Sequence, residues 1–225
     1  MKVAFIADVH SNLEALRATL NDIDLRGITR ILCAGDLVGY GANPNDVVAE
    51  LRSRRVECIA GNHDRAVSRM NPVGMNAMAA AAVYWTAKNI NAEAAGFLAG
   101  LKAHMQVDVE GTPLAIYHGS PRDDDEYLYE VDAVPELLEM TRSRVLVTGH
   151  THVPYVKSAP GGHLVNPGSV GQPRDGDPRA SYMVYDPGEP RFEIVRLQYD
   201  VQSAAKAITD AGLPGFLASR LIDGI

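Results

Sequence analysis

The sequence has few of the features that mark exported or membrane-bound proteins. It contains two cysteines, Cys33 and Cys58, and each lies in or beside an apolar run. No stretch approaches the roughly 18 apolar residues that a spanning helix needs. The first ten residues also lack the length of a secretory signal. We therefore expect a cytoplasmic protein, without a membrane partner, whose two thiols are buried and unpaired.

Basic side chains are also scarce. The chain has 21 Lys and Arg residues against 28 Asp and Glu residues, which gives a formal net charge of −7. Nucleic acids and acidic membranes usually require a basic face, so neither is an expected partner. A phosphate ligand would need a local source of positive charge, and bound divalent cations can supply it. The oligomeric state does not follow from the sequence.

The hydrophobic content of 46% allows a substantial core, and we expect one domain over residues 1–225. In the first sixty residues, three apolar segments (VAFIA, ILCAG and ECIAG) each lead into a polar turn and a helix-like stretch. Strands alternating with helices predict a parallel sheet. Ligands of such sheets gather beyond the carboxyl ends of the strands, so Asp8, Asp36 and Asn62 should converge there.

The rest of the chain has a different pattern. Residues 73–101 are rich in alanine and favour helix, with side chains suited to a packed face. Seven strand-like runs follow Leu101, and they predict a second, more antiparallel sheet packed on the first. The acidic segment 123–130 is predicted to be a solvated loop, because its carboxylates lack the spacing of a Ca²⁺ loop.

Five short clusters of metal-ligand residues follow apolar runs. They are Asp8-Val9-His10, Gly35-Asp36, Gly61-Asn62-His63-Asp64, Tyr117-His118-Gly119-Ser120 and Gly149-His150-Thr151-His152. Each one alone is a weak signal, because short polar turns are common. Together, however, they hold five of the seven histidines, and ordinary core histidines do not explain that concentration. His104 and His163 lack such neighbours and are predicted to be ordinary.

In this order the clusters resemble the motifs of the calcineurin-like metallophosphoesterase superfamily. Those motifs are Asp-x-His, Gly-Asp, Gly-Asn-His-Asp/Glu, a lone His and Gly-His-x-His, and the match spans Asp8 to His152. Residues 166–182 are further similar to the compact prokaryotic phosphodiesterase-like branch of the superfamily. The resemblance implies an α/β fold, a four-layer αββα sandwich with two mixed β-sheets flanked by helices. The metals would lie at the edge between the sheets.

The resemblance also implies a role for each matching side chain. One divalent metal ion would take Asp8, His10 and His152, the other Asn62, His118 and His150, and Asp36 would bridge them. Nitrogen and oxygen ligands suit transition metals, with Mn²⁺ as our first choice and Fe, Zn²⁺, Ni²⁺ or Co²⁺ as alternatives. A metal-activated water or hydroxide would attack phosphorus. His63 would be the catalytic residue that protonates the leaving oxygen or stabilises its charge.

Three further residues are candidates for substrate binding. The guanidinium groups of Arg65 and Arg174 match two phosphate oxygens, although an ordinary surface salt bridge is an equal alternative for each. Asn12 could touch substrate, but capping of the following helix is the favoured alternative.

The predicted substrate is a small phosphodiester. Related protein phosphatases and dinucleoside-polyphosphatases carry Asp-Arg-Gly after the Gly-Asp motif, whereas this sequence reads Gly39-Tyr40-Gly41. The change removes a phosphate-gripping Arg and an Asp that would orient His63. Phosphomonoesterase or nucleotide phosphatase activity is the second alternative. A catalytically silent, protein-binding scaffold of the same fold is the third, and the presence of every ligand argues against it.

Overall fold

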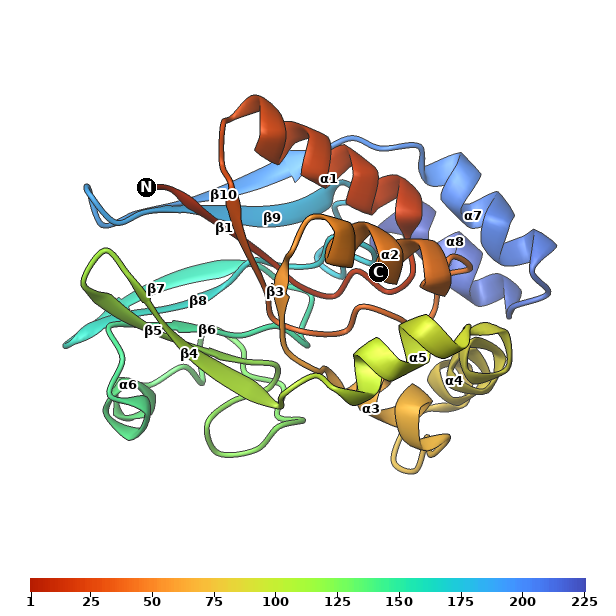
Figure 1. The fold of residues 1–225 in the computed structure, drawn as a ribbon, viewed down its shortest axis with the longest axis horizontal. Coiled ribbons are helices and arrows are strands. Elements are labelled where there is room, and N and C mark those ends of the chain that lie inside the picture. Colours follow the sequence, from red (N-terminus) through yellow and green to blue (C-terminus); the bar gives the residue numbers. More distant parts are fainter.

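A computed structural model describes residues 1–225, and its centre is a pair of five-stranded sheets packed face to face (Figure 1). The first sheet has the order β10-β9-β1-β2-β3, formed by Arg191–Leu197, Ala180–Asp186, Val3–Ile6, Arg30–Cys33 and Glu57–Cys58. The second has the order β4-β5-β6-β8-β7, formed by His104–Val109, Thr112–Tyr117, Val145–Val147, Gly162–Asn166 and Tyr155–Ala159.

Both sheets are mixed, with two parallel and two antiparallel pairings each, so the prediction that the second is the more antiparallel one is wrong. In the first, β1, β2 and β3 pair in parallel as predicted, while β9 and β10 extend the sheet antiparallel from the free edge of β1. In the second, β5, β6 and β8 are parallel, and the edge strands β4 and β7 are antiparallel. All seven late runs form strands, but the expectation that they share one sheet is wrong for the last two. The first six residues of β9 are buried on both faces of the strand. A strand buried on both faces has no alternation of polar and apolar residues, so its sequence does not show which sheet it joins.

Eight helices flank the sheets. They are α1 (Leu13–Leu25), α2 (Pro44–Ser53), α3 (Asn62–Arg69), α4 (Ala77–Asn89), α5 (Ala92–Ala99), α6 (Glu136–Thr141), α7 (Val201–Asp210) and α8 (Gly215–Asp223). Helices α1 and α2 cover the outer face of the first sheet, and α6 covers that of the second. The result is the predicted four-layer αββα sandwich. None of these helices combines the length and apolar character needed to cross a bilayer.

Alternation along β1 explains how the layers hold together. Val3 and Phe5 face the second sheet, whereas Ala4 and Ile6 face the helices, and all four are buried. Successive side chains of a strand point to opposite faces, so a strand covered on both sides must be apolar throughout. Burying a large apolar side chain contributes about 1.5–3 kcal/mol. Polar groups are therefore placed beyond the carboxyl end of the strand, where Asp8 begins the site.

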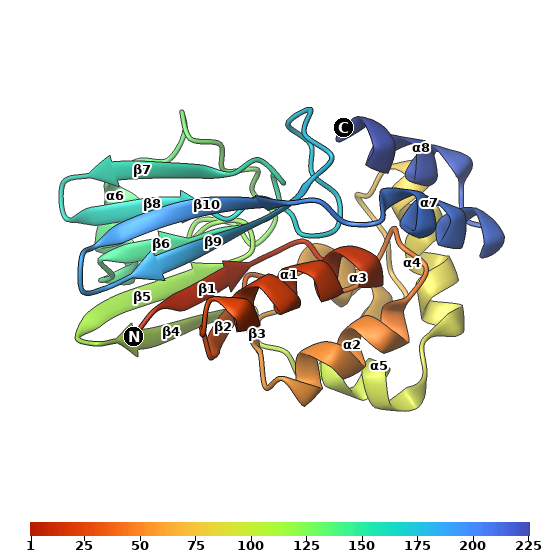
Figure 2. The same cartoon turned by 90° about the horizontal axis from the view of Figure 1, so that it is seen from above.

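A third group of helices lies beyond one end of the sheets. The predicted helical segment 73–101 forms α4 and α5, each capped at its start by an asparagine, Asn76 or Asn91. Helices α7 and α8 were not predicted, and they pack with α4 around the ring of Tyr40. Figure 2 shows α4, α7 and α8 together at this end of the molecule. We call these three helices the helical end group.

Candidate metal centre

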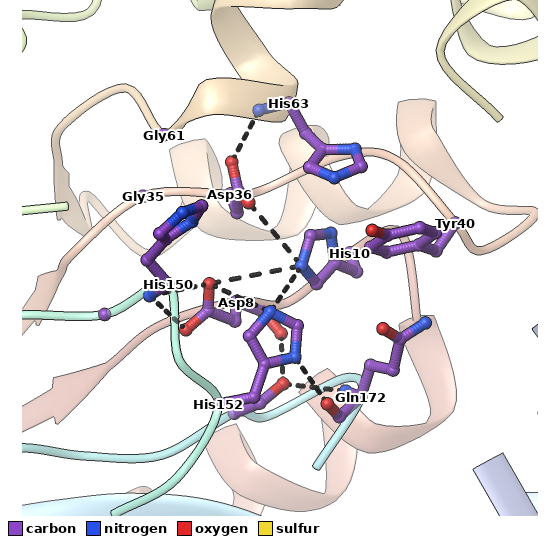
Figure 3. Close-up of polar contacts among 12 residues, drawn as sticks. Asp8, His10, Gly35, Asp36, Tyr40, Gly61, His63, His150, His152 and Gln172 are labelled. Atoms are coloured by element: carbon purple, nitrogen blue, oxygen red, sulfur yellow. Dashed lines mark hydrogen bonds and ion pairs between the residues drawn. The ribbon is translucent and has the colours of Figure 1, made fainter. Parts of the chain in front are cut away.

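Six buried histidine and aspartate side chains meet beyond the carboxyl ends of the strands. They are Asp8, His10, Asp36, His118, His150 and His152, and they come from the turns after β1, β2, β5 and β6. With His63, they form three overlapping sets whose ligand atoms lie within 4.8 Å of one another. Figure 3 shows most of this convergence. The turns that the sequence predicted to meet do lie together.

We call Asp8, His10 and His152 the first half-site. The Nε2 atoms of His10 and His152 are 3.1 Å apart. Asp8 Oδ1 lies 3.5 Å from the Nε2 of His152 and 4.0 Å from that of His10. Asp8 also accepts a hydrogen bond from the backbone N–H of His150, at 3.1 Å, which fixes its carboxylate toward the centre.

The far side of each imidazole in the first half-site is held by a backbone carbonyl. His10 Nδ1 lies 3.2 Å from the oxygen of Val38, and His152 Nδ1 lies 2.5 Å from that of Gln172. A carbonyl only accepts, so each Nδ1 carries the hydrogen and each Nε2 presents a lone pair. Burial lowers the pKa of both rings well below the usual value, which keeps them neutral. Two lone pairs facing each other beside a carboxylate fit a cation between them.

We call Asn62, His118 and His150 the second half-site. His118 Nε2 lies 3.0 Å from Asn62 Oδ1 and 3.1 Å from His150 Nδ1. The Nδ1 of His118 again has a backbone carbonyl behind it, the oxygen of Ala34 at 2.8 Å. This donor set is also nitrogen and oxygen without sulfur, as transition metals of intermediate softness prefer.

One oxygen of Asp36 reaches both half-sites. Its Oδ2 lies 3.6 Å from His10 Nε2 and 3.4 Å from His118 Nε2. Its Oδ1 accepts from the backbone N–H of His63 at 2.8 Å. The carboxylate of Asp36 therefore lies between the two half-sites and faces a histidine of each.

Burial and charge oppose each other in this centre. Burial raises the pKa of Asp8 to about 8. Burial also acts to raise the pKa of Asp36, but the charges of His118 and His63 hold that pKa well below its usual range. Desolvation acts to lower the pKa of His118, yet the charge of Asp36 raises it to about 9. A metal ion held by His118 would require the neutral ring, and its positive charge would take the place of the proton beside Asp36.

Backbone strain is concentrated at the same turns. The φ angles of Asp8, His10, Asp36, His150 and His152 are 54°, 49°, 53°, 66° and 60°. Residues other than glycine rarely adopt this left-handed region, and such strain gathers at functional sites where the surroundings impose it. The strain therefore supports a functional role for these turns on grounds independent of residue type.

The turn after β3 is pressed against Asp36. A Cβ added at Gly61 would lie 2.1 Å from Asp36 Oδ1, so only glycine fits this approach. The buried carboxylate of Asp64 ties the two turns together by accepting from the backbone N–H groups of Leu37, Val38 and Gly61, at 3.2, 3.1 and 2.9 Å. Asp64 thus supports the ligand turns.

His63 lies beside the centre, as the motif predicted. Its ring centroid is 4.8 Å from that of His10 and 4.3 Å from that of Tyr40. Burial lowers its pKa to about 4, and its Nδ1 has no hydrogen-bond partner. The sequence left the group that orients His63 open. In the structure the side chain packed against His63 is the ring of Tyr40. This residue lies in segment 39–41, which replaces the Asp-Arg-Gly of the related phosphatases.

A cavity of about 490 Å³ opens beside the centre. Its lining includes the metal-centre residues Asp36, Asn62, His63, His150 and His152. Arg65 and Arg174 also line it. The guanidinium of Arg65 pairs with Asp125 and donates to the oxygen of Ala60, whereas that of Arg174 donates to Gln172 Oε1 at 2.9 Å.

Asn12, by contrast, is used for structure. Its Oδ1 caps α1 by accepting from the N–H of Ala15, and its amide donates to the oxygens of Gly171 and Tyr199. It does not line the large cavity. Contact with a substrate would require it to give up one of these bonds.

Two tyrosines at the cavity were not predicted. Tyr40 packs on His10 and His63. Tyr127 is 52% exposed and its ring centroid lies 4.0 Å from that of His150. The acidic segment 123–130 is therefore more than a solvated loop, because it carries one wall of the cavity. The departure at residues 39–41 was the sequence signal for Tyr40, and Tyr127 lies in one of the loops, 119–130, where leaving-group recognition was expected.

Comparison with protein families gives one match along most of the chain. Residues 1–189 match the model of the calcineurin-like phosphoesterase superfamily domain. The match includes all five ligand turns and ends before β10 and the last two helices.

Several relatives align over most of their length. An uncharacterised protein of Methanocaldococcus jannaschii is 39% identical over 99% of this chain and 98% of its own. Phosphodiesterase YfcE of Escherichia coli K12 is 26% identical, over 83% of this chain and 88% of its own. The crystal structure of a metallophosphoesterase from Sphaerobacter thermophilus is 34% identical and superposes with a TM-score of 0.85, covering 100% of this chain and 99% of that one.

Proposed function

The chain belongs to the calcineurin-like phosphoesterase superfamily and is a metal-dependent phosphoester hydrolase, and from this premise we propose that it cleaves phosphodiesters at a binuclear metal centre. The observation that carries the proposal is the pair of neutral imidazoles, His10 and His152, whose lone pairs face each other 3.1 Å apart beside Asp8. A metal ion between them would make that arrangement favourable. Asp36 then extends the centre to a second group of ligands.

The proposed assignment gives each half-site one ion. Asp8, His10 and His152 hold one, Asn62, His118 and His150 hold the other, and Asp36 serves both. Manganese is our first choice, and Fe, Zn, Ni and Co are the alternatives. All five accept imidazole and carboxylate ligands, so metal availability decides between them. Such ions, when bound, supply positive charge and a water that ionises near neutral pH.

His63 is the proposed general acid. It lies beside Asp36, lines the cavity, and has an Nδ1 that no protein group occupies. Burial lowers the pKa of His63 to about 4, so its ring is neutral near pH 7 before substrate binds. The negative charge of a bound phosphate would raise that pKa, and His63 would then protonate the leaving oxygen or stabilise its charge, a contribution typically worth about 10²–10⁴-fold. Tyr40 orients the ring by packing on it, and Arg65 and Arg174 bind anionic oxygens of the substrate. Asn12 is retained as a weaker candidate for substrate contact.

The test of His63 uses leaving groups of different basicity. His63→Ala should lower turnover about 10²–10⁴-fold on an alkyl phosphodiester, and less on bis-p-nitrophenyl phosphate, whose leaving group needs little protonation. Metal content, measured by plasma mass spectrometry, is the control. A variant that keeps its metal and loses no turnover on the alkyl ester would show that the role is wrong.

A diester is preferred over a monoester for two reasons. The sequence lacks the Asp-Arg-Gly that accompanies protein phosphatases of this superfamily, and the 490 Å³ cavity has room for groups on both sides of a phosphate. Comparing bis-p-nitrophenyl phosphate with p-nitrophenyl phosphate on Mn²⁺-loaded protein tests the preference. A higher kcat/KM for the monoester would favour the phosphomonoesterase or nucleotide phosphatase alternative. Bound metal without turnover of any phosphoester would favour the scaffold.

The remaining expectations belong to the same proposal. Residues 1–225 act as one domain on a small phosphoester in the cytoplasm. The net charge of −7 disfavours nucleic acid as a partner of the protein. Size-exclusion chromatography with light scattering would supply the oligomeric state.

A further inference from the structure

Two arginines from distant parts of the chain meet on the ring of Tyr40. The Cζ atom of Arg174 lies 5.7 Å from the ring centroid, and that of Arg220, in α8, lies 5.9 Å from it. Tyr40 also packs on His63 and lines the cavity, as does Arg174. The pair is therefore built around a residue of the candidate active site.

Neither arginine forms an ion pair with an Asp or Glu side chain. Eight other arginines form ion pairs with Asp or Glu, namely Arg26, Arg30, Arg52, Arg54, Arg65, Arg122, Arg179 and Arg196. Six further arginines also lack such a pair, but all six are exposed, whereas Arg174 and Arg220 are half-buried, so the absence is informative for these two. Arg174 uses Nη2 on Gln172 and Tyr40, and its buried Nε has no partner. Arg220 donates from Nε to the oxygen of Ile225, the last residue of the sequence, at 2.5 Å, and its two Nη groups have no partner.

The two charges also act on each other. Burial, followed by the charge of Arg174, lowers the pKa of Arg220. Two guanidinium groups on one ring repel each other when no Asp or Glu side chain pairs with either, and a bound anion would offset that repulsion. Arg65, the other cationic candidate of the cavity, is already paired with Asp125.

The position of Arg220 is fixed by the fold. The oxygen of Gly224, at the end of α8, accepts from the N–H of Gly176 at 2.9 Å, which joins α8 to the loop that carries Arg174. Leu217 and Leu221, on either side of Arg220 in α8, pack in the same apolar cluster as Tyr40. Helix α8 lies beyond residue 189, where the family match ends. This arrangement is therefore an addition to the common domain.

We propose that Arg174 and Arg220 form a second anion-binding subsite beside the metal centre, so that the preferred substrate is a phosphoester carrying another phosphate group away from the scissile one. The inference rests on the proposed hydrolase function, and it deepens that function by naming the substrate class. Guanidinium groups suit this role because their planar fork binds two phosphate oxygens at once.

A matched pair of chromogenic esters tests the subsite. Thymidine 5′-(p-nitrophenyl phosphate) and the same ester with a 3′-phosphate differ only in the second anion, and both release p-nitrophenol. The native enzyme should prefer the phosphorylated ester by about tenfold or more in kcat/KM, mainly through KM, as expected for charge-assisted hydrogen bonds. Arg220→Gln should bring the ratio to within about twofold of one, and Arg220→Lys should restore part of it.

Two control variants make the result specific. Arg17→Gln removes an exposed, unpaired arginine from α1 and should leave the ratio at the native value. Arg69→Gln removes an exposed arginine that lines the same cavity. If Arg69→Gln abolishes the preference and Arg220→Gln does not, the second anion binds elsewhere and the proposal is wrong. An equal kcat/KM for both esters in the native enzyme would also overturn it.

A binding measurement separates this inference from the hydrolase proposal. Calorimetry with thymidine 3′,5′-bisphosphate and thymidine 5′-monophosphate needs no turnover. The bisphosphate should bind the native protein about tenfold more tightly, and Arg220→Gln should remove that difference. If neither ester is hydrolysed but the bisphosphate preference is present and depends on Arg220, the subsite stands and the phosphodiesterase proposal fails. Equal affinities would reject the subsite whatever the turnover.

Discussion

The two half-sites are built from similar ligands but differ in how the protein encloses them. Asp8, His10 and His152 are almost fully buried, and both imidazoles of this first half-site are fixed by carbonyls behind them. In the second half-site, Asn62 is only half-buried. His150 lies under the exposed ring of Tyr127 at the cavity wall.

This difference indicates a division of work within one centre. Ligands that are pre-oriented and shielded from water bind a metal tightly, because little freedom is lost on binding. Ligands at a cavity wall are closer to substrate and to solvent. We therefore expect the first half-site to fill first and to release its ion slowly, and the second to exchange more readily.

The largest effect should come from breaking both half-sites at once. Asp36→Asn removes the negative charge of the carboxylate whose Oδ2 faces both His10 and His118. We expect more than about a 100-fold loss of turnover, beyond the range for residues that only support a ligand, together with loss of metal from both positions. Activity and metal content are the measurements. Asp46→Asn, in the exposed first turn of α2, is the control and should change neither. Two tightly held ions in Asp36→Asn would contradict the shared carboxylate.

Removing one histidine from each half-site sharpens the comparison. His152→Gln should weaken the tighter metal position, whereas His150→Gln should leave one tight equivalent and weaken only the other, each by at least about 10–100-fold. Competition titration with a metal-binding dye measures the two affinities separately. Identical titration curves for the two variants would show that the half-sites are equivalent.

Adding a methyl group at Gly61 tests how closely the turns after β2 and β3 fit against each other. Gly61→Ala places a Cβ 2.1 Å from Asp36 Oδ1, so we expect about 1–3 kcal/mol of destabilisation from overpacking and a displaced Asp36. Gly96→Ala is the matched control, because its Cβ meets nothing within 4 Å in α5 and should stabilise by roughly 0.5–1 kcal/mol. Urea unfolding measures both. Equal stability of the two variants would mean that the Gly61 turn yields at little cost.

A stability effect of similar size is expected at Asp64, which ties the turns after β2 and β3 together. In the native protein the two oxygens of Asp64 accept from three backbone N–H groups. Asp64→Asn replaces one of these oxygens by an NH₂ group, so at least one backbone N–H loses its acceptor. We expect the free energy of unfolding to fall by about 1–3 kcal/mol, with both metal affinities reduced by similar factors. An effect confined to one metal position would show that Asp64 supports only that half-site.

The sequence predicted the parts of the molecule that depend on local patterns. Alternating strands and helices placed Asp8, Asp36 and Asn62 at one edge, and the structure brings these turns together. The ordered motifs identified the superfamily. These features are local because a strand, its following turn and its ligand are contiguous in the chain.

What the sequence missed depends on contacts between distant segments. The choice of β9 and β10 to join the first sheet follows from pairing with β1, about 180 residues away in the sequence, and no local pattern encodes it. Tyr127 lines the cavity and Arg220 packs on the ring of Tyr40, and both come from segments without any motif. The assignment of individual ligands, of His63 and of the substrate residues stays a prediction until metal and substrate are observed.

The pairing of β1 with both β2 and β9 also bears on how the chain is made. During synthesis β2 emerges soon after β1, but β9 begins only at Ala180, so one edge of β1 stays open while about 150 residues are added. At 5–20 residues per second, this exposure lasts roughly 7–30 s on the ribosome. An unpaired edge on an apolar strand is prone to aggregate, so a nascent chain of this protein should depend on chaperones until its last strands appear.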